Sequence, residues 1–234
     1  MFKFFKRWFP GRDEVSKPKS AVTQAVAMLR REYEGKPFNE NNVDPDPVSQ
    51  FTTWFEVAVK AIKFDPNAMI LTTVDPNGQP SSRTVLLKGF DDEGFIFYTN
   101  YRSRKAKHIE QNPNVSLTFY WPDLVRQIHI EGVAKKISAE QSDQYFASRP
   151  DSSKLSAWAS DQSHPISSRK ELENRLKTIE KKFSGGTIPR PPHWGGFCVA
   201  PHRIEFWQGR LNRLHDRIAY QKENGKWKME RLSP

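Results

Sequence analysis

The amino-acid sequence predicts a mainly β protein, built as one domain on an antiparallel barrel with helices at its periphery. Three observations lead to this class. Runs rich in β-branched and aromatic residues follow one another across short turns of Gly, Asn, Asp or Pro, as in sequential hairpins. No strand-helix-strand repeat of the kind that builds a parallel nucleotide-binding sheet occurs. The 234 residues include 7 Trp, 6 Tyr and 16 Phe, which supply enough large apolar side chains for a sizeable core.

The first half of the chain carries signals for three helices. Residues 21–34 are rich in helix formers and are followed by a polar linker that contains proline. In residues 48–63 apolar side chains recur at three- and four-residue steps, as on an amphipathic helix. Ser103 can cap a third helix that runs through Gln111. Five strands are predicted around these helices, at residues 68–74, 81–90, 95–100, 115–121 and 125–137.

The second half is predicted to be helical first and extended afterwards. Three helical stretches, the first of them stopped by Pro150, are expected over residues 138–149, 151–160 and 167–184. They are expected to cover the sheet or to bridge to a partner. Four strands close the chain, the last two joined by a turn at Asn224-Gly225, and they are expected at residues 196–200, 202–209, 217–223 and 226–232.

The composition excludes several classes of protein. The chain has 37 Lys plus Arg against 27 Asp plus Glu, which gives a formal charge of +10. No apolar run approaches the roughly 20 residues that cross a bilayer, so an integral membrane protein is excluded. The single cysteine, Cys198, rules out an intramolecular disulfide framework and a multi-cysteine metal centre, and it fits a cytoplasmic location. No two of the six histidines have the i, i+4 spacing of a helical metal pair, so no bound metal is expected.

The N-terminus has a composition of its own. The first twelve residues, MFKFFKRWFPGR, hold four basic side chains and no acidic one. Such a stretch could lie on an anionic membrane surface, but it is too short for a stable isolated helix, and Asp13 and Glu14 follow at once. We therefore favour a frayed tail. Residues 1–20 are predicted to be a flexible extension and residues 21–234 a single domain.

Two groups of basic and hydroxyl side chains are placed where they could bind anions. Residues 103–105, Ser-Arg-Lys, lie where a strand ends and a helix begins, so main-chain N–H groups and the helix dipole would add to two cations. Tyr145 and Arg149 are four residues apart on one helical face, and Ser153 opens the next helix. Each group suits a phosphate, although a capped helix with solvated surface charges has the same pattern. The sequence lacks a Gly-x-Ser-x-Gly elbow, a P-loop and a Gly-x-Gly-x-x-Gly motif, which removes the usual support for a hydrolase or a kinase.

Residues 204–217, IEFWQGRLNRLHDR, form the most informative fragment. If its last part is extended, alternation places Arg213, His215 and Arg217 on one face, with Leu214 on the other. Three basic groups in a row repel one another, so an anionic or electron-rich ligand would stabilise the arrangement. The alternative is an exposed strand edge blunted by charge.

This fragment resembles the C-terminal signature of the pyridoxine (pyridoxamine) 5'-phosphate oxidase family, in which an acid, an aromatic residue and Trp precede Arg-Leu-His-Asp-Arg. Here the signature reads Glu205, Phe206, Trp207 and residues 213–217. The resemblance covers the chain from about Leu29 to Pro234. It includes the motifs RTVLLK at 83–88, FYTN at 97–100, SRKA at 103–106, RQ at 126–127, YFASRP at 145–150 and QS at 162–163.

The resemblance implies a split-barrel FMN-binding fold and a homodimer with two FMN sites at the subunit interface. It also implies an oxidase of vitamin B6 biosynthesis or salvage. Pyridoxamine or pyridoxine 5'-phosphate would give up a hydride from C4' to N5 of the flavin, and O2 would reoxidise the flavin, so that pyridoxal 5'-phosphate and hydrogen peroxide result. The protein would chiefly hold the substrate carbon near the flavin and tune both rings.

The family's site residues carry over position by position. The implied FMN contacts are Arg83, Thr84, Val85, Leu86, Leu87, Lys88, Tyr98, Thr99, Arg104, Lys105, Gln127, Gln162, Ser163, Trp207 and Arg217. The implied substrate contacts are Lys88, Tyr145, Arg149, Ser153, Arg213, Leu214 and His215, joined by Arg30, Arg31 and Tyr33 from a mobile N-terminal lid over about residues 21–46. Arg213 and His215 are the expected catalytic pair, with Arg213 over the pyridine ring opposite the flavin, and neither is an obligatory base.

Two questions stay open at the level of sequence. Arg83 and Lys88 are five residues apart, so a regular strand would aim them at opposite faces. A bulge, or contacts with two FMN molecules across a dimer, would reconcile their shared role. The alternative functions are another FMN oxidoreductase on the same barrel, such as a flavin reductase, and a basic protein that binds nucleic acid or an acidic membrane. No nucleic-acid motif supports the last, and contact with neither nucleic acid nor the interior of a membrane is expected.

Overall fold

The computed structural model describes residues 25, 26, 28, 29 and 31–234, and the chain divides into two compact units, Met1–Glu32 and Tyr33–Pro234. In the first unit Ala25, Val26 and Met28 are helical, whereas Arg31 and Glu32 are not. The helix predicted over residues 21–34 therefore ends early, because Gly35 and Pro37 follow and disfavour helical backbone. The predicted extension, residues 1–20, and Arg30 of the predicted lid lie outside the described residues.

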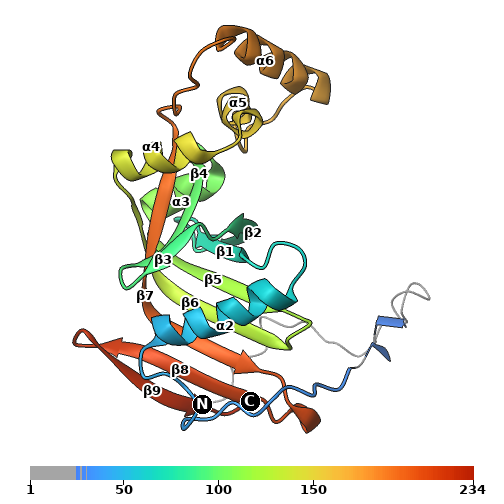
Figure 1. Cartoon of the computed structure of the whole chain (residues 1–234), viewed down its shortest axis with the longest axis vertical. Coiled ribbons are helices and arrows are strands. Elements are labelled where there is room, and N and C mark those ends of the chain that lie inside the picture. Colours follow the sequence, from blue (N-terminus) through green and yellow to red (C-terminus); the bar gives the residue numbers. More distant parts are fainter. Residues whose placement is uncertain (1–24, 27, 30) are drawn as a thin grey trace, which may run out of the picture. The chain divides into compact units, whose positions relative to one another are not determined.

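The second unit is built on one antiparallel sheet that curls into a half-barrel (Figure 1). Its strands are β1 Ala68–Val74, β2 Pro80–Leu86, β3 Gly89–Asp91, β4 Gly94–Asn100, β5 Asn114–Trp121, β6 Arg126–Lys136, β7 Trp194–Gln208, β8 Asp216–Glu223 and β9 Lys226–Leu232. The strand order is β2-β1-β5-β6-β7-β4-β3, with β8 beside β7 and β9 beside β8. All pairings are antiparallel, so the predicted fold class is confirmed.

The helices of this unit are α2 Pro47–Ala61, α3 Arg104–Gln111, α4 Ala139–Ser148, α5 Asp151–Ala159 and α6 Arg169–Lys182. Helix α2 begins where the Asp46 carboxylate accepts a hydrogen bond from the Ser49 main-chain N–H, with a proline in the first turn. Its predicted apolar stripe is buried at Phe51 and Trp54. Helices α3 and α4 are capped by serine hydroxyls. No helix in residues 31–234 or at the four described positions before them is long and apolar enough to span a membrane.

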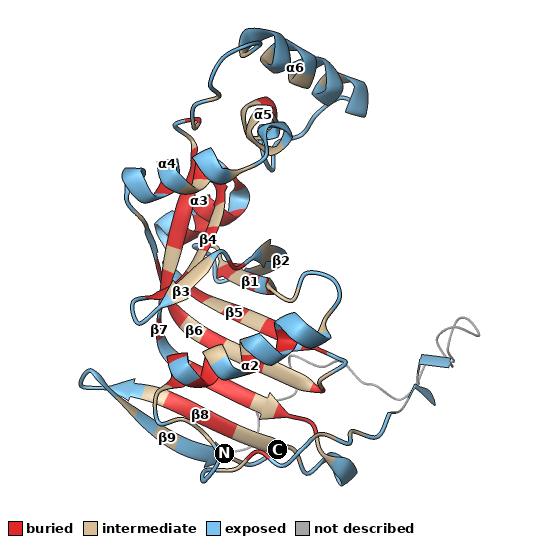
Figure 2. Ribbon diagram, in the orientation of Figure 1, coloured by how far each residue is buried: buried red, intermediate tan, exposed pale blue. Residues whose placement is uncertain are grey.

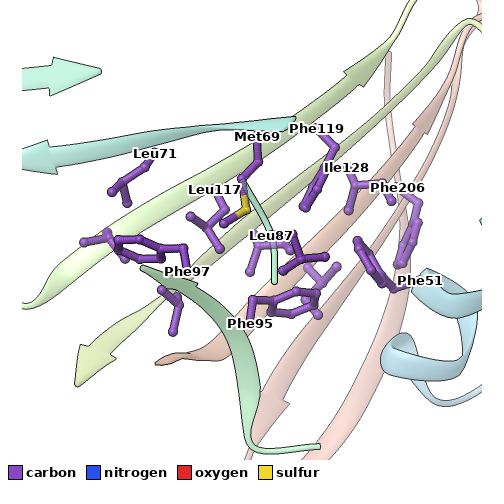
Figure 3. Close-up of a cluster of buried hydrophobic side chains, with 14 of the residues drawn as sticks. Phe51, Met69, Leu71, Leu87, Phe95, Phe97, Leu117, Phe119, Ile128 and Phe206 are labelled. Carbon is purple, nitrogen blue, oxygen red and sulfur yellow. The ribbon is translucent and has the colours of Figure 1, made fainter. Parts of the chain in front are cut away.

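The core is dense in aromatic rings, as the composition predicts. Phe51 of α2 is fully buried, and its ring centroid lies 4.8, 4.9 and 5.3 Å from those of Phe90, Phe95 and Phe119 (Figure 3). Buried and less buried residues alternate along β5, whereas β4 and β7 are buried over longer runs, and α6 has no buried residue (Figure 2). The sheet and α2 therefore form the scaffold on which α3, α4 and α5 are placed.

The predicted strand at 81–90 is interrupted. Strand β2 ends at Leu86 and β3 starts at Gly89. Between them the Leu87 side chain enters the core, and the main-chain N–H of Lys88 donates to the carbonyl of Ile96 at 2.8 Å. The break adds a sixth strand to the five predicted for the first half.

The strands predicted at 196–200 and 202–209 are one continuous strand, β7. Its register against β6 shifts by one residue, because Glu131 pairs with Arg203 while Gly132 pairs with Pro201. His202 is left as the extra residue of a bulge, and this irregularity accommodates a proline that has no N–H to donate. Two strands were predicted on either side of Pro201, whereas the structure has one strand with a bulge there.

Two local predictions near the expected site were wrong. The stretch of residues 213–217 is not extended throughout: Leu211–Arg213 form a 3-10 helix in which Asn212 and Arg213 have positive φ of 55° and 61°. The predicted alternation of Arg213, His215 and Arg217 therefore does not hold. Arg149 lies beyond the end of α4 in extended backbone, because Pro150 disfavours helical geometry at the residue before it.

Candidate functional site

A hollow of about 800 Å³ lies among β2, β4, the first residue of β7 and the helices α3, α4 and α5. Among the described residues that line it there is no Asp or Glu. The cationic side chains in its wall are Arg83, Lys88, Arg104, Lys105 and Arg149. A concave surface with several cations and no carboxylate to balance them attracts an anionic ligand, and its volume suits a small molecule.

The hollow gathers most of the residues that sequence comparison had implied. Arg83 and Lys88 both line it, although they are five residues apart. A regular strand would aim them at opposite faces, but β2 ends at Leu86, between the two residues. Both residues therefore line the same hollow within one chain. Of the implied residues, the hollow brings together Thr84, Val85, Leu86, Tyr98, Thr99, Arg104, Lys105, Tyr145, Arg149, Ser153, Gln162 and Ser163 with Arg83 and Lys88. The side chain of Leu87 lies in the core instead.

Arg83 is held rigidly at the wall of the hollow. Its Nη1 donates to the Leu71 carbonyl at 3.1 Å and to Thr73 Oγ1 at 2.9 Å, and its Nη2 donates to Ser81 Oγ at 2.9 Å. All three partners are neutral. Burial and the charge of Arg104 lower the pKa of Arg83, although a guanidinium stays charged at neutral pH. The charge of Arg83 is therefore available to a ligand.

Lys105 is a nearly buried cation at the start of α3. Its Nζ donates to Gln162 Oε1 at 2.8 Å, Thr99 Oγ1 at 3.2 Å and Ser103 Oγ at 3.4 Å. Burial, and to a smaller extent the charge of Arg83, lower the pKa of Lys105 to about 8. A group in this state gains from a ligand that carries negative charge.

Arg149 stands against an aromatic wall. Its guanidinium carbon lies 4.6 Å from the ring centroid of Trp194, and the rings of Trp194, Tyr98 and Tyr145 are nearly parallel, with Tyr98 and Tyr145 3.9 Å apart. Nη1 of Arg149 is buried and has no hydrogen-bond partner among the described residues. An unpaired guanidinium N–H that is cut off from water costs free energy until an acceptor arrives, so the hollow is suited to receive one.

A second group of implied residues, here called the C-terminal cluster, consists of Tyr33, Gln127, Trp207, Arg213, Leu214, His215 and Arg217. The ring of His215 lies 4.7 Å from that of Trp207 and 5.6 Å from that of Tyr33. The Arg213 guanidinium lies 5.3 Å from the Tyr33 ring.

The other members lie around these contacts. Gln127 and Arg217 flank Trp207 on the neighbouring strands. Leu214 is largely exposed. Arg31 is exposed and belongs to the first unit.

The protonation state of His215 follows from its contacts. The main-chain N–H of Arg210 donates to Nδ1 of His215 at 3.0 Å, so this nitrogen carries no proton. Burial and the nearby charge of Arg213 lower the pKa of His215, which keeps the ring neutral at pH 7. Its proton is then on Nε2, where it can be donated to a ligand oxygen.

Arg217 is fixed by a buried carboxylate. Its Nε donates to Oε1 of Glu205 at 2.8 Å, and Arg203 donates to the other carboxylate oxygen at 2.8 Å. Burial opposes the charge of Glu205, but the hydrogen bonds and charges of Arg217 and Arg203 lower its pKa overall. The guanidinium of Arg217 is thereby oriented by the signature acid.

The hollow and the C-terminal cluster lie at opposite ends of β7. Trp194, which lines the hollow, is thirteen residues before Trp207, and extended strand rises about 3.3 Å per residue, so the two are roughly 40 Å apart. No residue of the C-terminal cluster lines the hollow. One copy of the chain therefore carries two separated halves of the implied site.

Sequence reasoning missed seven residues that line the hollow: Ser81, Ser82, Asn100, Ser156, Ala157, Ser160 and Trp194. Trp194 had no distinctive local signal, because its role depends on Tyr98 and Arg149 from other elements. Among the residues that the structure describes, no group of three or more His, Cys, Asp or Glu side chains could hold a metal ion.

Comparison with known proteins agrees with these features. Residues 55–183 match the family described as Pyridoxamine 5'-phosphate oxidase, and residues 194–234 match the one described as Pyridoxine 5'-phosphate oxidase C-terminal dimerisation region. A protein of Rubrobacter xylanophilus named Pyridoxine/pyridoxamine 5'-phosphate oxidase is 56% identical over 209 residues, which are 89% of this chain and 96% of that protein. A protein of the same name from Gloeothece citriformis is 53% identical over 214 residues, 91% of this chain and 100% of its own.

Solved structures agree as well. PhzG from Burkholderia lata 383, in complex with tetrahydrophenazine-1-carboxylic acid, superposes with a TM-score of 0.81 at 29% identity, covering 86% of this chain and 99% of PhzG. An FMN binding protein from Nostoc punctiforme, at 20% identity and a TM-score of 0.65, covers 82% of this chain and 100% of its own, and it supports the fold alone. On the family matches and the identity to the two oxidases, this chain belongs to the pyridoxamine 5'-phosphate oxidase family.

Proposed function

We propose that this protein is an FMN-dependent oxidase that converts pyridoxamine or pyridoxine 5'-phosphate to pyridoxal 5'-phosphate. The observation that carries the proposal is the hollow whose described lining has five cations and no carboxylate, in a chain of this family. Two phosphates, one of the cofactor and one of the substrate, would account for the five cations. On the single-cysteine composition we place the activity in the cytoplasm.

The residues of the hollow fit FMN. Arg83, Arg104 and Lys105 would bind its phosphate, and the N-terminus of α3 would add main-chain donors. Gln162, Thr99 and Ser103 accept the three N–H groups of Lys105, so a phosphate that accepts from Lys105 would replace one of these neutral partners. FMN would supply the redox chemistry, taking a hydride from C4' of the substrate and passing the electrons to O2, which becomes hydrogen peroxide. Pyridoxine phosphate would lose its hydroxyl proton as it becomes the aldehyde, whereas the imine formed from pyridoxamine phosphate would be hydrolysed by water to the aldehyde and ammonia.

The substrate phosphate would bind at the opposite end of the hollow. Lys88 and Arg149 provide the charge there, and Tyr145 and Ser153 provide hydroxyl donors. The guanidinium of Arg149, which lines the hollow, would supply charge-assisted donors to this phosphate. Uptake of a phosphate at this point would hold the substrate by its one permanently charged group and leave its ring free to face the flavin.

Arg213 and His215 would complete the site from a second copy of the chain. Within a homodimer, the C-terminal cluster of one subunit would close the hollow of the other, since the two halves are too far apart to meet within one chain. Arg213 would lie over the substrate ring, and His215 would donate from Nε2 to a substrate oxygen. Tyr33, in contact with both, would close the site as part of the predicted lid.

The outer face of the sheet supports this dimer. Ile70, Leu86 and Tyr120 are 44%, 37% and 53% exposed on that face. Tyr120, Gln127, Trp207 and Arg217 follow one another across four paired strands, so the apolar residues adjoin the C-terminal cluster. Large apolar side chains beside a polar site are typical of a protein interface, and the C-terminal region matches a dimerisation region.

The direct test is anaerobic. Purified protein, first checked for a flavin absorbance band, is mixed with pyridoxamine 5'-phosphate without oxygen. We expect the band to bleach and then to return with stoichiometric peroxide when air is admitted. A flavin band that bleaches with NADPH and not with either B6 phosphate would indicate a flavin reductase instead. Colourless protein that takes up no FMN would contradict both.

The shared site is tested by mixing two inactive variants. Arg149→Ala disables the hollow, and Arg213→Leu disables the C-terminal cluster. Random reassociation puts half of the dimers into the mixed form, in which one of two sites is intact, so about a quarter of wild-type activity should return. The matched control mixes Arg149→Ala with Lys88→Ala, which disable the same half. If no activity returns in the first mixture although the subunits are shown to exchange, the result would contradict a site built from two chains.

A further inference from the structure

A buried hydroxyl behind the hollow connects Arg83 to a histidine that the proposed function does not use. Thr73 on β1 is 0% exposed, and His108 on α3 is 6% exposed. Thr73 Oγ1 accepts from Arg83 at 2.9 Å and lies 3.2 Å from Nδ1 of His108. The three residues come from three elements, β2, β1 and α3, that meet under the floor of the hollow.

The number of protons decides the direction of these bonds. A threonine hydroxyl has a single proton to donate, and the contact with Arg83 uses the oxygen as an acceptor. The two acceptors within reach of that proton are Nδ1 of His108 at 3.2 Å and the Ser81 carbonyl at 3.5 Å. The shorter contact pairs the Thr73 hydroxyl with His108, whose Nδ1 accepts from it in the Nε2–H tautomer.

The same bonds determine which donors Arg83 has left. Of its five N–H groups, both on Nη1 are used by Leu71 and Thr73, and one on Nη2 is used by Ser81. The Nε–H and one Nη2–H remain. Two adjacent guanidinium donors are the fork that binds two oxygens of one phosphate.

We propose that Thr73 and His108 are a positioning pair that orients Arg83 for the phosphate of the cofactor. The proposal rests on the assignment of Arg83 to the FMN phosphate in the proposed function. Nδ1 of His108 holds the Thr73 hydroxyl with its lone pairs toward Arg83, and Thr73 holds Nη1 of Arg83, which leaves Nε–H and one Nη2–H for the phosphate. Because His108 lies on the helix that carries Arg104 and Lys105, the pair also ties the Arg83 strand to the other phosphate-binding element.

The test compares two flavins that differ only in the phosphate. FMN and riboflavin are titrated into apoprotein of the full chain, and the ratio of their affinities is measured by quenching of flavin fluorescence. Thr73→Val keeps the shape and removes the hydroxyl, so FMN affinity should fall about tenfold while riboflavin affinity stays unchanged. Thr73→Ser, which restores the hydroxyl, should restore the ratio. His108→Leu should lower FMN affinity in the same way, and His108→Gln, whose amide oxygen can accept from Thr73, should recover it.

Thr72→Val is the matched control, since Thr72 is the neighbour of Thr73 on the same strand, faces the opposite side and hydrogen-bonds Ser82. Its affinity ratio should equal that of the wild type. Equal losses for FMN and riboflavin in Thr73→Val, or a wild-type ratio in both Thr73→Val and His108→Leu, would overturn the positioning role while leaving the proposed function intact. Wild-type protein that binds riboflavin as tightly as FMN would refute the phosphate assignment, and the positioning role with it.

Discussion

The lowered pKa of Lys105 makes FMN binding dependent on pH in a direction that can be stated in advance. Its amine has a pKa of about 8 in the free protein, because burial and Arg83 disfavour the charged form. A phosphate monoester loses its second proton near pH 6, so it is a dianion throughout the range in which Lys105 titrates. Binding the dianion favours charged Lys105 and raises its pKa.

The direction and size of the change in FMN affinity with pH follow from proton linkage. Below pH 8 the amine is already charged, and affinity should hardly change. Above pH 8 each binding event must first take up a proton, so FMN affinity should fall about tenfold, or ~1.4 kcal/mol, for each further pH unit until the pKa of the complex is reached. At pH 9 the dissociation constant should therefore be about ten times its value at pH 7.5.

The assay is titration of apoprotein with FMN between pH 7 and pH 9.5 at constant ionic strength, since salt screens the same charges. Lys105→Arg is the control, because a guanidinium remains charged over the whole range and should remove the decline above pH 8. A decline of the same steepness in Lys105→Arg would assign the titration to another group and refute the reasoning. An affinity that rises with pH in the wild type would refute it as well.

Three further predictions concern catalysis and stability. Arg213→Leu should lower kcat/KM for pyridoxamine 5'-phosphate far more than it lowers FMN affinity, because Arg213 is assigned to the substrate ring, and an unchanged rate would exclude that role. Gly35→Ala should cost about 1–3 kcal/mol in urea unfolding, since a Cβ there would clash with Gln208 and Gly209, whereas Gly186→Ala, with open space around it, should be neutral. Phe51→Ala should cost about 3–5 kcal/mol, measured by the same unfolding, because it removes a fully buried ring, and Phe64→Ala on the surface should cost little.

Sequence patterns predicted the fold well wherever local structure and tertiary burial point the same way. Strand β1 was predicted from its apolar and β-branched residues, and the structure buries Met69 and Leu71 on one face while Ile70 is exposed on the other. The N-cap of α3 at Ser103 was predicted from the residue type alone, because a serine cap depends only on its own helix. The failures occurred where tertiary contacts override local preference. Asn212 and Arg213 adopt positive φ, and no residue type there demands it.

The chemistry of the site was easier to foresee than its assembly. The residue types around the hollow suggested phosphate from their charge alone, and the signature motifs suggested which phosphates. Neither source could place Trp194 against Arg149, because that contact joins residues 45 positions apart across two elements. The role of Thr73 and His108 was not predicted for the same reason. Each is an ordinary buried polar residue until the fold brings Arg83 to Thr73 and Thr73 to His108.

The geometry of β7 constrains how activity can arise. One strand carries Trp194 at the hollow and Trp207 in the C-terminal cluster. It pairs with β6 from Phe197 to Gln208, and on its other side with β4 up to Val199 and with β8 from Arg203. A hinge that brought its ends together would break these ladders and expose the core that they cover. Closure of the predicted lid would move Tyr33, but it would not shorten β7. Completion of the proposed site therefore depends on association with a second chain, and loss of the dimer should abolish oxidation even where the hollow keeps its affinity for the phosphate of FMN.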